Sequence, residues 1–359
     1  MPLTAIIADE ISAHGPMPFA RFMALALYHP AHGYYSGGRA SVGRNGDFFT
    51  NVSVGSLFGR LLAAQFAEMW ERMGRPADFS IVEQGAHGGE FAADVLDALR
   101  GSEFFLAVTY RIVEPSPVLT ARQRERLSEF GGNVVWCDSL DALAPFSGVH
   151  FSNELPDAFP VHVVKWDGGA WCERCVAVDG GRFIFVDAPL STPTLAAACA
   201  QIPHPLPPGY TTEVNLAARE WIAAVAAKLV RGCVLVVDYG HERAEYYTPE
   251  RIEGTLSAYA NHRREPDPLA RPGEIDLTAH VEFTSLIESA GMRLAGFTDQ
   301  HHFMVGLGAD HFADGANPGD VRAFQTLMHP QMMGMVFKVV CFAKGVEFTP
   351  PLSGFRYAR

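Results

Sequence analysis

The chain has 359 residues, of which 48% are hydrophobic and 19% are charged, and its formal net charge is −12 at pH 7. This length and composition are typical of a globular protein with a full core and room for insertions. So acidic a chain is a poor electrostatic partner for nucleic acid or an anionic membrane, and we expect neither as a partner.

The N-terminus predicts a cytoplasmic protein. Residues 1–10 have neither the basic region and apolar core of a secretory signal nor the Arg and Ser enrichment of a mitochondrial presequence. No stretch approaches the eighteen or so apolar residues of a membrane span, so we expect no membrane insertion. The six scattered cysteines, several of them in apolar runs, indicate reduced and mostly buried thiols.

Helical patterns dominate the first part of the chain. Apolar residues recur every three or four positions through residues 3–30, which predicts helices interrupted at Gly15-Pro16. The aromatic segment 33–50 contains too many glycines for a helix or a strand. We expect this loop to fold over a ligand, with an ordered surface loop as the alternative. Residues 57–73 form an amphipathic helix.

A glycine-rich turn follows the first predicted strand. Phe79 to Val82 is a short apolar run that ends at Glu83, and the turn Gly85-Ala-His-Gly-Gly89 comes next. Apolar residues at helical spacing occupy 91–99. A strand, a glycine turn and a helix in this order present backbone N–H groups and a helix N-terminus to a ligand in α/β proteins.

Strands and helices keep alternating through the chain, and each apolar strand stops at a polar or acidic residue. This alternation predicts a parallel, doubly wound α/β sheet with ligands at the carboxyl ends of its strands. Counting gives seven sheet strands, with the last two forming an antiparallel edge. The later elements are strands at 105–114, 133–137, 149–152, 232–237, 292–297 and 336–342, and helices at 117–130, 214–230 and 281–290.

Two insertions interrupt this alternation. β-rich stretches separated by Asp-Gly-Gly turns predict an antiparallel β insertion that caps the site. The expected division is an N-terminal helical and lid segment at 1–75, an α/β domain at 76–345 with insertions at 160–210 and 241–280, and a tail at 346–359.

The glycine turn and the strand ends suggest which ligand binds. His87 stands where a dinucleotide fingerprint has its middle glycine, which argues against a pyrophosphate and a nicotinamide oxidoreductase. Glu114 closes the next strand and can accept both hydroxyls of a ribose, or cap the helix after it. Asp138 closes a third strand and can face an adenine amine, or cap its own turn. One acid for a ribose, one acid for an adenine and a glycine turn that contacts no pyrophosphate together suit S-adenosylmethionine as the ligand.

Ordered motifs run through nearly the whole chain: Tyr28-His-Pro30, Gly33-Tyr-Tyr35, Gly46-Asp-Phe48 with Thr50, Glu83-x-Gly85, Val113-Glu-Pro-Ser-Pro117, Asn153-Glu-Leu-Pro-Asp-Ala158, Asp238-Tyr-Gly-His241 and Pro272-Gly-Glu-Ile-Asp-Leu-Thr-Ala-His-Val281. In these segments the sequence resembles the MidA-like methyltransferases, the family of the mitochondrial arginine methyltransferase that assists assembly of respiratory complex I. The resemblance implies a class I (Rossmann-like) methyltransferase fold and S-adenosylmethionine as the cofactor. It also implies transfer to a protein arginine or, in some members, to a small-molecule carboxylate.

The resemblance assigns roles to residues at the strand ends and in the lid segment. On the acceptor side we expect the catalytic residues Asp47, Asn153, Glu154 and Asp157. The cofactor-binding residues expected are Glu83, Gly85, Ala86, His87, Gly89, Glu114, Pro115, Ser116, Asp138, Ser139 and Asn153, with Gly46, Phe48 and Thr50 closing over the cofactor.

The sequence departs from the family at two places. The family's Gly-Pro-Gly-x-Gly turn is replaced by Gly85-Ala-His-Gly-Gly89, and its Ser-Pro-Glu after the lid motif is Asn51-Val52-Ser53. The second change removes a carboxylate from the acceptor side. It leaves open a carboxylate acceptor, for which Arg39, Arg44 and His280 could form a clamp. A non-catalytic assembly or binding factor of the same fold is the second alternative.

No metal site is predicted. The motif Cys172-Glu-Arg-Cys175 stands alone, zinc needs two further ligands, and residues three apart in a strand point to opposite faces. The partner expected from the resemblance is a methyl acceptor, either a protein or a small molecule. A homodimer is left open.

Overall fold

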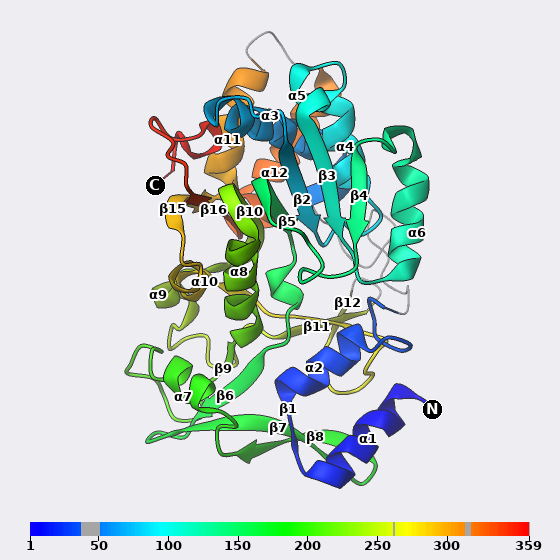
Figure 1. Cartoon of the computed structure of the whole chain (residues 1–359). Helices are drawn as coiled ribbons and strands as arrows, with labels where there is room; N and C mark the ends of the chain where they lie inside the picture. The colour runs from blue at the N-terminus through cyan, green and yellow to red at the C-terminus, as the bar shows by residue number, and fades with distance from the viewer. Residues whose placement is uncertain (37–50, 261–262, 313–316, 359) are drawn as a thin grey trace.

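The computed structural model describes residues 1–36, 51–260, 263–312 and 317–358, and its centre is a mostly parallel sheet (Figure 1). In spatial order the strands are β15 (Arg293–Asp299), β16 (Phe337–Lys344), β10 (Leu229–His241), β5 (Phe146–Asn153), β2 (Phe79–Gln84), β3 (Val108–Val113) and β4 (Val134–Cys137). The five strands from β10 to β4 are parallel to one another. Strand β16 runs antiparallel to both of its neighbours, β10 and β15, which confirms the expected sheet with its antiparallel edge. The short β14 (Val281–Glu282) pairs with the end of β10.

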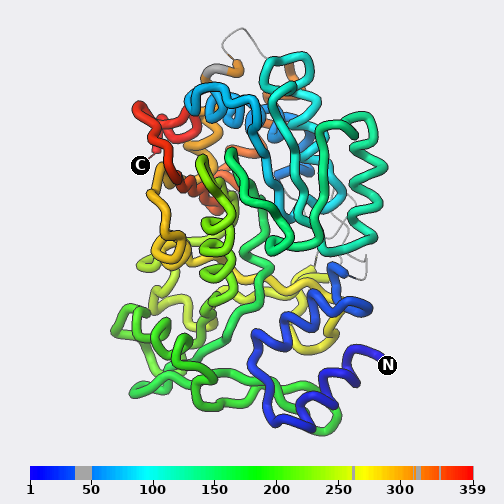
Figure 2. Tube along the Cα trace, viewed as in Figure 1, coloured from blue at the N-terminus to red at the C-terminus, as the bar shows by residue number. Residues whose placement is uncertain are grey.

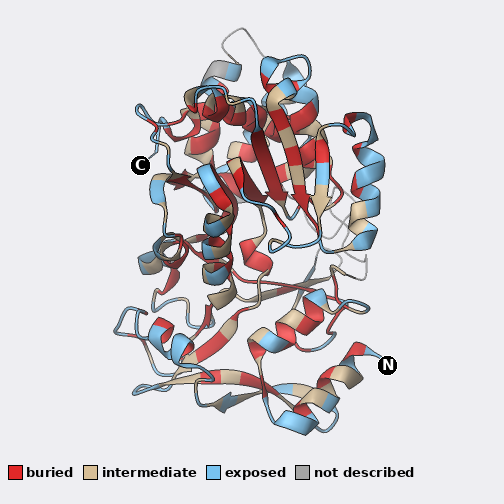
Figure 3. Ribbon diagram, viewed as in Figure 1, coloured by how far each residue is buried: buried red, intermediate tan, exposed pale blue. Residues whose placement is uncertain are grey.

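Helices cover both faces of this sheet, so its strands read as nearly continuous apolar runs. Consecutive residues of β2 belong to different cores: Ile81 packs on one face and Val82 on the other. The central strands are accordingly coloured as buried along most of their length (Figure 3). The first face packs against α3 (Leu57–Arg72), α4 (Glu90–Leu99), α5 (Glu103–Ala107), α11 (Gln300–His311) and α12 (Pro318–Met328), and the second against α8 (Leu216–Lys228) and α10 (Phe283–Ser289). Helix α6 (Pro117–Arg126) flanks β4.

A second body, built from three separate parts of the sequence, lies beyond the carboxyl ends of the parallel strands (Figures 1 and 2). One core joins its N-terminal helices to the strands of the insertions. Its helices are α1 (Leu3–His14), α2 (Phe19–Tyr28), α7 (Pro193–Cys199) and α9 (Arg243–Tyr246). Its strands are β1 (Met17–Pro18), β6 (His162–Trp166), β7 (Trp171–Asp179), β8 (Arg182–Ala188) and β9 (Thr211–Val214) in one sheet, and β11 (Ser257–Ala260), β12 (Arg263–Glu265) and β13 (Asp276–Thr278) in another.

The expected hairpins of the first insertion are present, because β6, β7 and β8 pair antiparallel in sequence order. Helix α3 packs in the main core beside α4, whereas α1 and α2 pack in the second body. The domain bounds at residues 75 and 345 stay predictions. Within the described part of the chain, every helix is too short or too polar to traverse a lipid bilayer.

Some expected elements differ from the structure. Residues 103–107 form a helix ahead of β3 because the Ser102 hydroxyl accepts a hydrogen bond from the Phe105 amide and starts a helical turn. Helices α11 and α12 were not predicted, and α10 begins two residues later than expected because residues 281 and 282 form β14. The last residues are anchored by the amide of Gly354, which donates to Gln65 Oε1 at 2.9 Å.

Close packing at the starts of β5 and β10 yields a stability prediction. Gly148 has a φ of 142°, and a Cβ there would lie 2.0 Å from the carbonyl oxygen of Ser80 on β2. We expect Gly148→Ala to lower the free energy of unfolding by about 2–4 kcal/mol in chemical denaturation. Gly132→Ala is the matched control, because nothing lies within 4 Å of its Cβ position. Equal unfolding midpoints for the two variants would contradict this account.

Candidate active site

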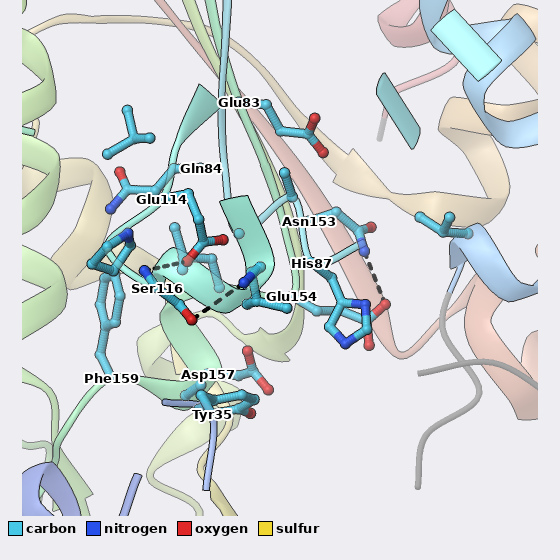
Figure 4. A pocket seen from close by; sticks show the side chains of 18 of the residues that line it. Tyr35, Glu83, Gln84, His87, Glu114, Ser116, Asn153, Glu154, Asp157 and Phe159 are labelled. Atoms are coloured by element: carbon cyan, nitrogen blue, oxygen red, sulfur yellow. Dashed lines mark hydrogen bonds between the residues drawn. The ribbon is translucent and has the colours of Figure 1, made fainter. Parts of the chain in front are cut away.

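A cavity of about 910 Å³ lies where the carboxyl ends of β2, β3 and β5 face the second body (Figure 4). Its lining comes from the glycine turn, from the ends of β3, β5 and β10, and from the second body. The expected residues in the lining are Glu83, Gly85, Ala86, His87, Glu114, Pro115, Ser116, Asn153, Glu154 and Asp157. The carboxyl edge of the sheet is therefore hollow, as the sequence analysis expected.

The glycine turn bends through left-handed backbone. Gly85 and Gly89 both have a φ of 83°, and His87 has a φ of 46°, which is uncommon for a residue with a side chain. The bend is supported by Gln123, whose Nε2 donates to the carbonyl oxygen of His87 at 2.8 Å. Gly89 forms the N-cap of α4 and does not belong to the cavity lining.

Glu114 is held at the end of β3 by two donors. The amide of Ser116 donates to Oε1 at 2.9 Å, and Gln123 Nε2 donates to Oε2 at 3.0 Å. Each carboxylate oxygen keeps a further lone pair, so a pair of ribose hydroxyls can still donate to it. Burial raises the pKa of Glu114 above its ordinary value. Its contact with Ser116 also agrees with the capping alternative, so Glu114 can serve both roles.

Glu83 lies deeper, at the end of β2. Its Oε2 accepts a hydrogen bond of 2.7 Å from the hydroxyl of Tyr110, and burial raises its pKa to about 8. Glu83 and Glu114 both line the cavity, so the two acids expected at the cofactor side share one hollow.

The acceptor-side residues follow β5. Glu154 has a φ of 53°, and its Oε1 accepts from Asn153 Nδ2 at 2.9 Å. Asp157 Oδ2 accepts a hydrogen bond from the hydroxyl of Tyr239 on β10. Burial raises the pKa of Glu154 to about 8, and the neighbouring Asp157 adds to the shift. Two of the three non-glycine residues with positive φ in the described ranges, His87 and Glu154, thus lie in the cavity wall, where backbone strain commonly marks function.

Several expected site residues lie elsewhere. Asp138 and Ser139 are absent from the lining; the Ser139 hydroxyl donates to Asp138 Oδ1 at 3.1 Å and accepts from the Ala142 amide at 3.2 Å. This geometry agrees with the turn-capping alternative, with Ser139 as the cap, and the adenine contact of Asp138 stays a prediction. Gly46, Asp47, Phe48 and Thr50 fall outside the described residues.

Apart from Tyr35, which belongs to the segment 33–50 expected to fold over a ligand, no role was predicted for the part of the wall that the second body and the later strands supply. These residues come from segments far apart in the sequence, so no local spacing connects them. The available signal was the family motifs, which contain or adjoin Tyr28, Tyr35, Phe159, Tyr239, Asp276 and Thr278 but not Phe337. The additional lining residues are Tyr28, Tyr35, Phe159, Tyr239, Tyr259, Asp276, Thr278 and Phe337.

Known proteins share this fold. A family model described as S-adenosyl-L-methionine-dependent methyltransferase matches residues 61–298. A protein of Burkholderia thailandensis, whose crystal structure holds S-adenosyl-homocysteine, is 35% identical with a TM-score of 0.88, covering 99% of this chain and 95% of that chain. "Protein arginine methyltransferase NDUFAF7, mitochondrial" of Homo sapiens is 27% identical over 100% of this chain and 86% of its own. The Drosophila melanogaster homologue is 28% identical over 94% of this chain and 84% of its own.

The sheet and its cavity define a class I, Rossmann-like methyltransferase. The chain belongs to the S-adenosyl-L-methionine-dependent methyltransferase family, which confirms the resemblance to the MidA-like proteins. It is an enzyme of that class, so the alternative of a non-catalytic binding factor is not supported. His87, Val52 and Ser53, which motivated that alternative, line the cavity without filling it.

The cavity fits S-adenosylmethionine. Gly85 leaves its side of the turn without a side chain, and a Cβ there would meet Leu155 Cδ1 at 3.4 Å. Glu114 offers acceptor oxygens to a ribose, and the described lining contains no Lys or Arg to hold a phosphate. When bound, this cofactor supplies a methyl group on a sulfonium leaving group. The chain's own residues would hold it between the turn and Glu114.

The comparisons correct one expectation. The relatives from Drosophila melanogaster, Homo sapiens and Mus musculus are named as mitochondrial proteins, so the prediction of a cytoplasmic location is wrong. That prediction relied on residues 1–10 lacking a targeting pattern.

The geometry of Glu114 gives a prediction for cofactor binding. We expect Glu114→Ala to weaken S-adenosylmethionine by about 1–3 kcal/mol in calorimetric titration, because two acceptor oxygens for the ribose are lost. Glu125→Ala is the control, since Glu125 is exposed on the neighbouring helix α6. Equal affinities for the two variants would remove Glu114 from the cofactor site.

Proposed function

We propose that the methyl acceptor is the guanidinium group of an arginine side chain in a protein. The observation that carries this proposal is the charge of the cavity. Its described lining contains six carboxylates and neither Lys nor Arg. Of these, Asp157 is close to Glu154, and both Asp157 and Asp276 are close to Tyr28 and Tyr35 of the second body. A buried lining rich in carboxylates, with no Lys or Arg among its described residues, suits a cationic acceptor better than an anionic one.

Aromatic side chains support the same acceptor. Tyr28 and Tyr35 stack with ring centroids 5.6 Å apart, and the hydroxyl of Tyr35 donates to Asp276 Oδ1 at 2.8 Å. Tyr239, Tyr259 and Phe337 also line the cavity. A planar guanidinium can bind carboxylates through its N–H groups while its face contacts such rings.

The alternative of a small-molecule carboxylate needs a positive clamp. Arg39 and Arg44 fall outside the described residues, and His280 is absent from the cavity lining. Burial lowers the pKa of His280 to about 4, so its imidazole is neutral near pH 7. The described residues therefore support this alternative less well. The names of the human and Drosophila relatives, both protein arginine methyltransferases, also favour arginine.

A transfer assay tests the acceptor class. Purified enzyme would be incubated with labelled S-adenosylmethionine and arginine-containing peptides, with lysine-substituted copies of the same peptides, and with small carboxylic acids. We expect label in the arginine peptides alone, because the acidic wall binds a guanidinium bidentately. Label that accumulates in a carboxylic acid would refute the proposal.

Glu154 supplies a second, sharper prediction. Because the pKa of Glu154 lies near 8 in the free protein, its carboxylate forms as the pH rises, and only the ionised form attracts a guanidinium. KM for an arginine peptide should therefore fall as the pH rises toward about 8. Glu154→Gln should abolish this dependence and lower kcat/KM by roughly tenfold to a hundredfold. Exposed Glu250→Gln is the control, and a pH dependence that survives in Glu154→Gln would contradict the assignment.

A further inference from the structure

All polar atoms of Asp157 except one form hydrogen bonds within the protein. Its amide donates to Asp238 Oδ2 at 3.2 Å, and its carbonyl oxygen accepts from the amide of Ala279 at 3.0 Å. Its Oδ2 accepts from the hydroxyl of Tyr239. Only Oδ1, which is buried, has no hydrogen-bond partner, and Asp157 lines the cavity. Figure 4 shows its carboxylate near Tyr35 on the acceptor side. A buried carboxylate oxygen with no partner is costly unless a ligand donates to it.

Tyr239 cannot easily turn away from Asp157. Its ring packs edge-on against His280 and Phe337, with centroid distances of 5.3 Å and 5.6 Å. Its amide donates to Asp238 Oδ1 at 2.8 Å. The last residues of β10 therefore fix both the backbone and one carboxylate oxygen of Asp157. This leaves the other oxygen in a defined direction.

This inference rests on the proposed function. We infer that Tyr239 is a positioning residue that occupies Asp157 Oδ2, so that Oδ1 is the atom that receives the proton of the arginine guanidinium. The hydroxyl keeps the carboxylate from rotating and from binding the acceptor with the wrong oxygen. The hydroxyl of Tyr239 needs no contact with the acceptor or the cofactor, while its ring, which Tyr239→Phe keeps, stays in the cavity lining.

The step balances without a further reagent. The guanidinium nitrogen gains a bond to the methyl carbon as the carbon–sulfur bond breaks, and that electron pair stays on the sulfur. The methylated nitrogen loses one N–H proton, which passes to Asp157 Oδ1 and converts the carboxylate to a carboxylic acid. After product release this proton returns to solvent. The guanidinium keeps its single positive charge, and the sulfonium charge leaves as the released proton.

The groups around Asp157 decide its pH dependence. Burial raises its pKa above the ordinary aspartate value, and the hydrogen bond from Tyr239 opposes this. The titratable groups facing it are Asp238 and Tyr239 of β10, Glu154 of its own loop, and Tyr28 and Tyr35 of the second body. Asp157 accepts a proton only when ionised, so kcat should rise with pH through its pKa and be lost below it.

The test compares kcat against pH for wild type and Tyr239→Phe, which removes the hydroxyl and keeps the ring. Losing a hydrogen bond to the ionised form should move the acidic limb upward by about one to two pH units. KM for the peptide and the affinity for S-adenosyl-homocysteine should stay within roughly twofold of wild type. Carbon-13 NMR of labelled aspartate provides a direct readout: the carboxyl signal missing in Asp157→Asn should titrate at higher pH in Tyr239→Phe.

Tyr246→Phe is the matched control. Tyr246 is also buried, and its hydroxyl donates to the carboxylate of Glu213 at 3.1 Å, but it is absent from the cavity lining. This variant should lose stability and keep the wild-type pH profile. If Tyr239→Phe behaves in the same way, with an unmoved acidic limb and Asp157 signal, the positioning role is refuted. If wild type transfers methyl to no arginine peptide, the proposed function fails and this inference fails with it.

Discussion

The molecule depends on the parallel register that brings the ends of β2, β5 and β10 to one level. Gln84 pairs with Ser152, and Asn153 pairs with Val237, so the residues that follow these strands emerge side by side. Gly148 and Gly232 permit this register, because a Cβ at either position would meet backbone of the neighbouring strand at about 2 Å. The glycine turn, the loop at Glu154 and the tip of β10 can then surround a single cavity.

Burial gives this cavity its chemical character. Carboxylates removed from water resist ionisation, which is why the pKa values of Glu83 and Glu154 rise to about 8. A cation that enters the cavity recovers part of that cost by pairing with them. The sulfonium of the cofactor and the guanidinium of the proposed acceptor are both cations. An acidic cavity can therefore attract the sulfonium and, under the proposed function, the guanidinium as well.

The second body completes the cavity. Tyr28 and Tyr35 from the N-terminus and Asp276 from the second insertion close the cavity over the end of the sheet. These residues come from sequence positions more than two hundred residues apart, yet one hydrogen bond joins Tyr35 to Asp276. The N-terminal segment and the second insertion thus close the cavity together, whereas the described lining contains no residue of the first insertion.

The sequence by itself determined the strand–turn–helix order, the doubly wound sheet and the acids at the ends of β2 and β3. These features depend on local periodicity and on the rule that parallel strands end at one edge. Only the tertiary structure decided that Asp138 and Ser139 bond to each other in the turn after β4, that α11 and α12 are helical, and that the Tyr239 hydroxyl binds Asp157. Such contacts join residues distant in sequence, and their strength depends on burial and orientation, which no local spacing encodes.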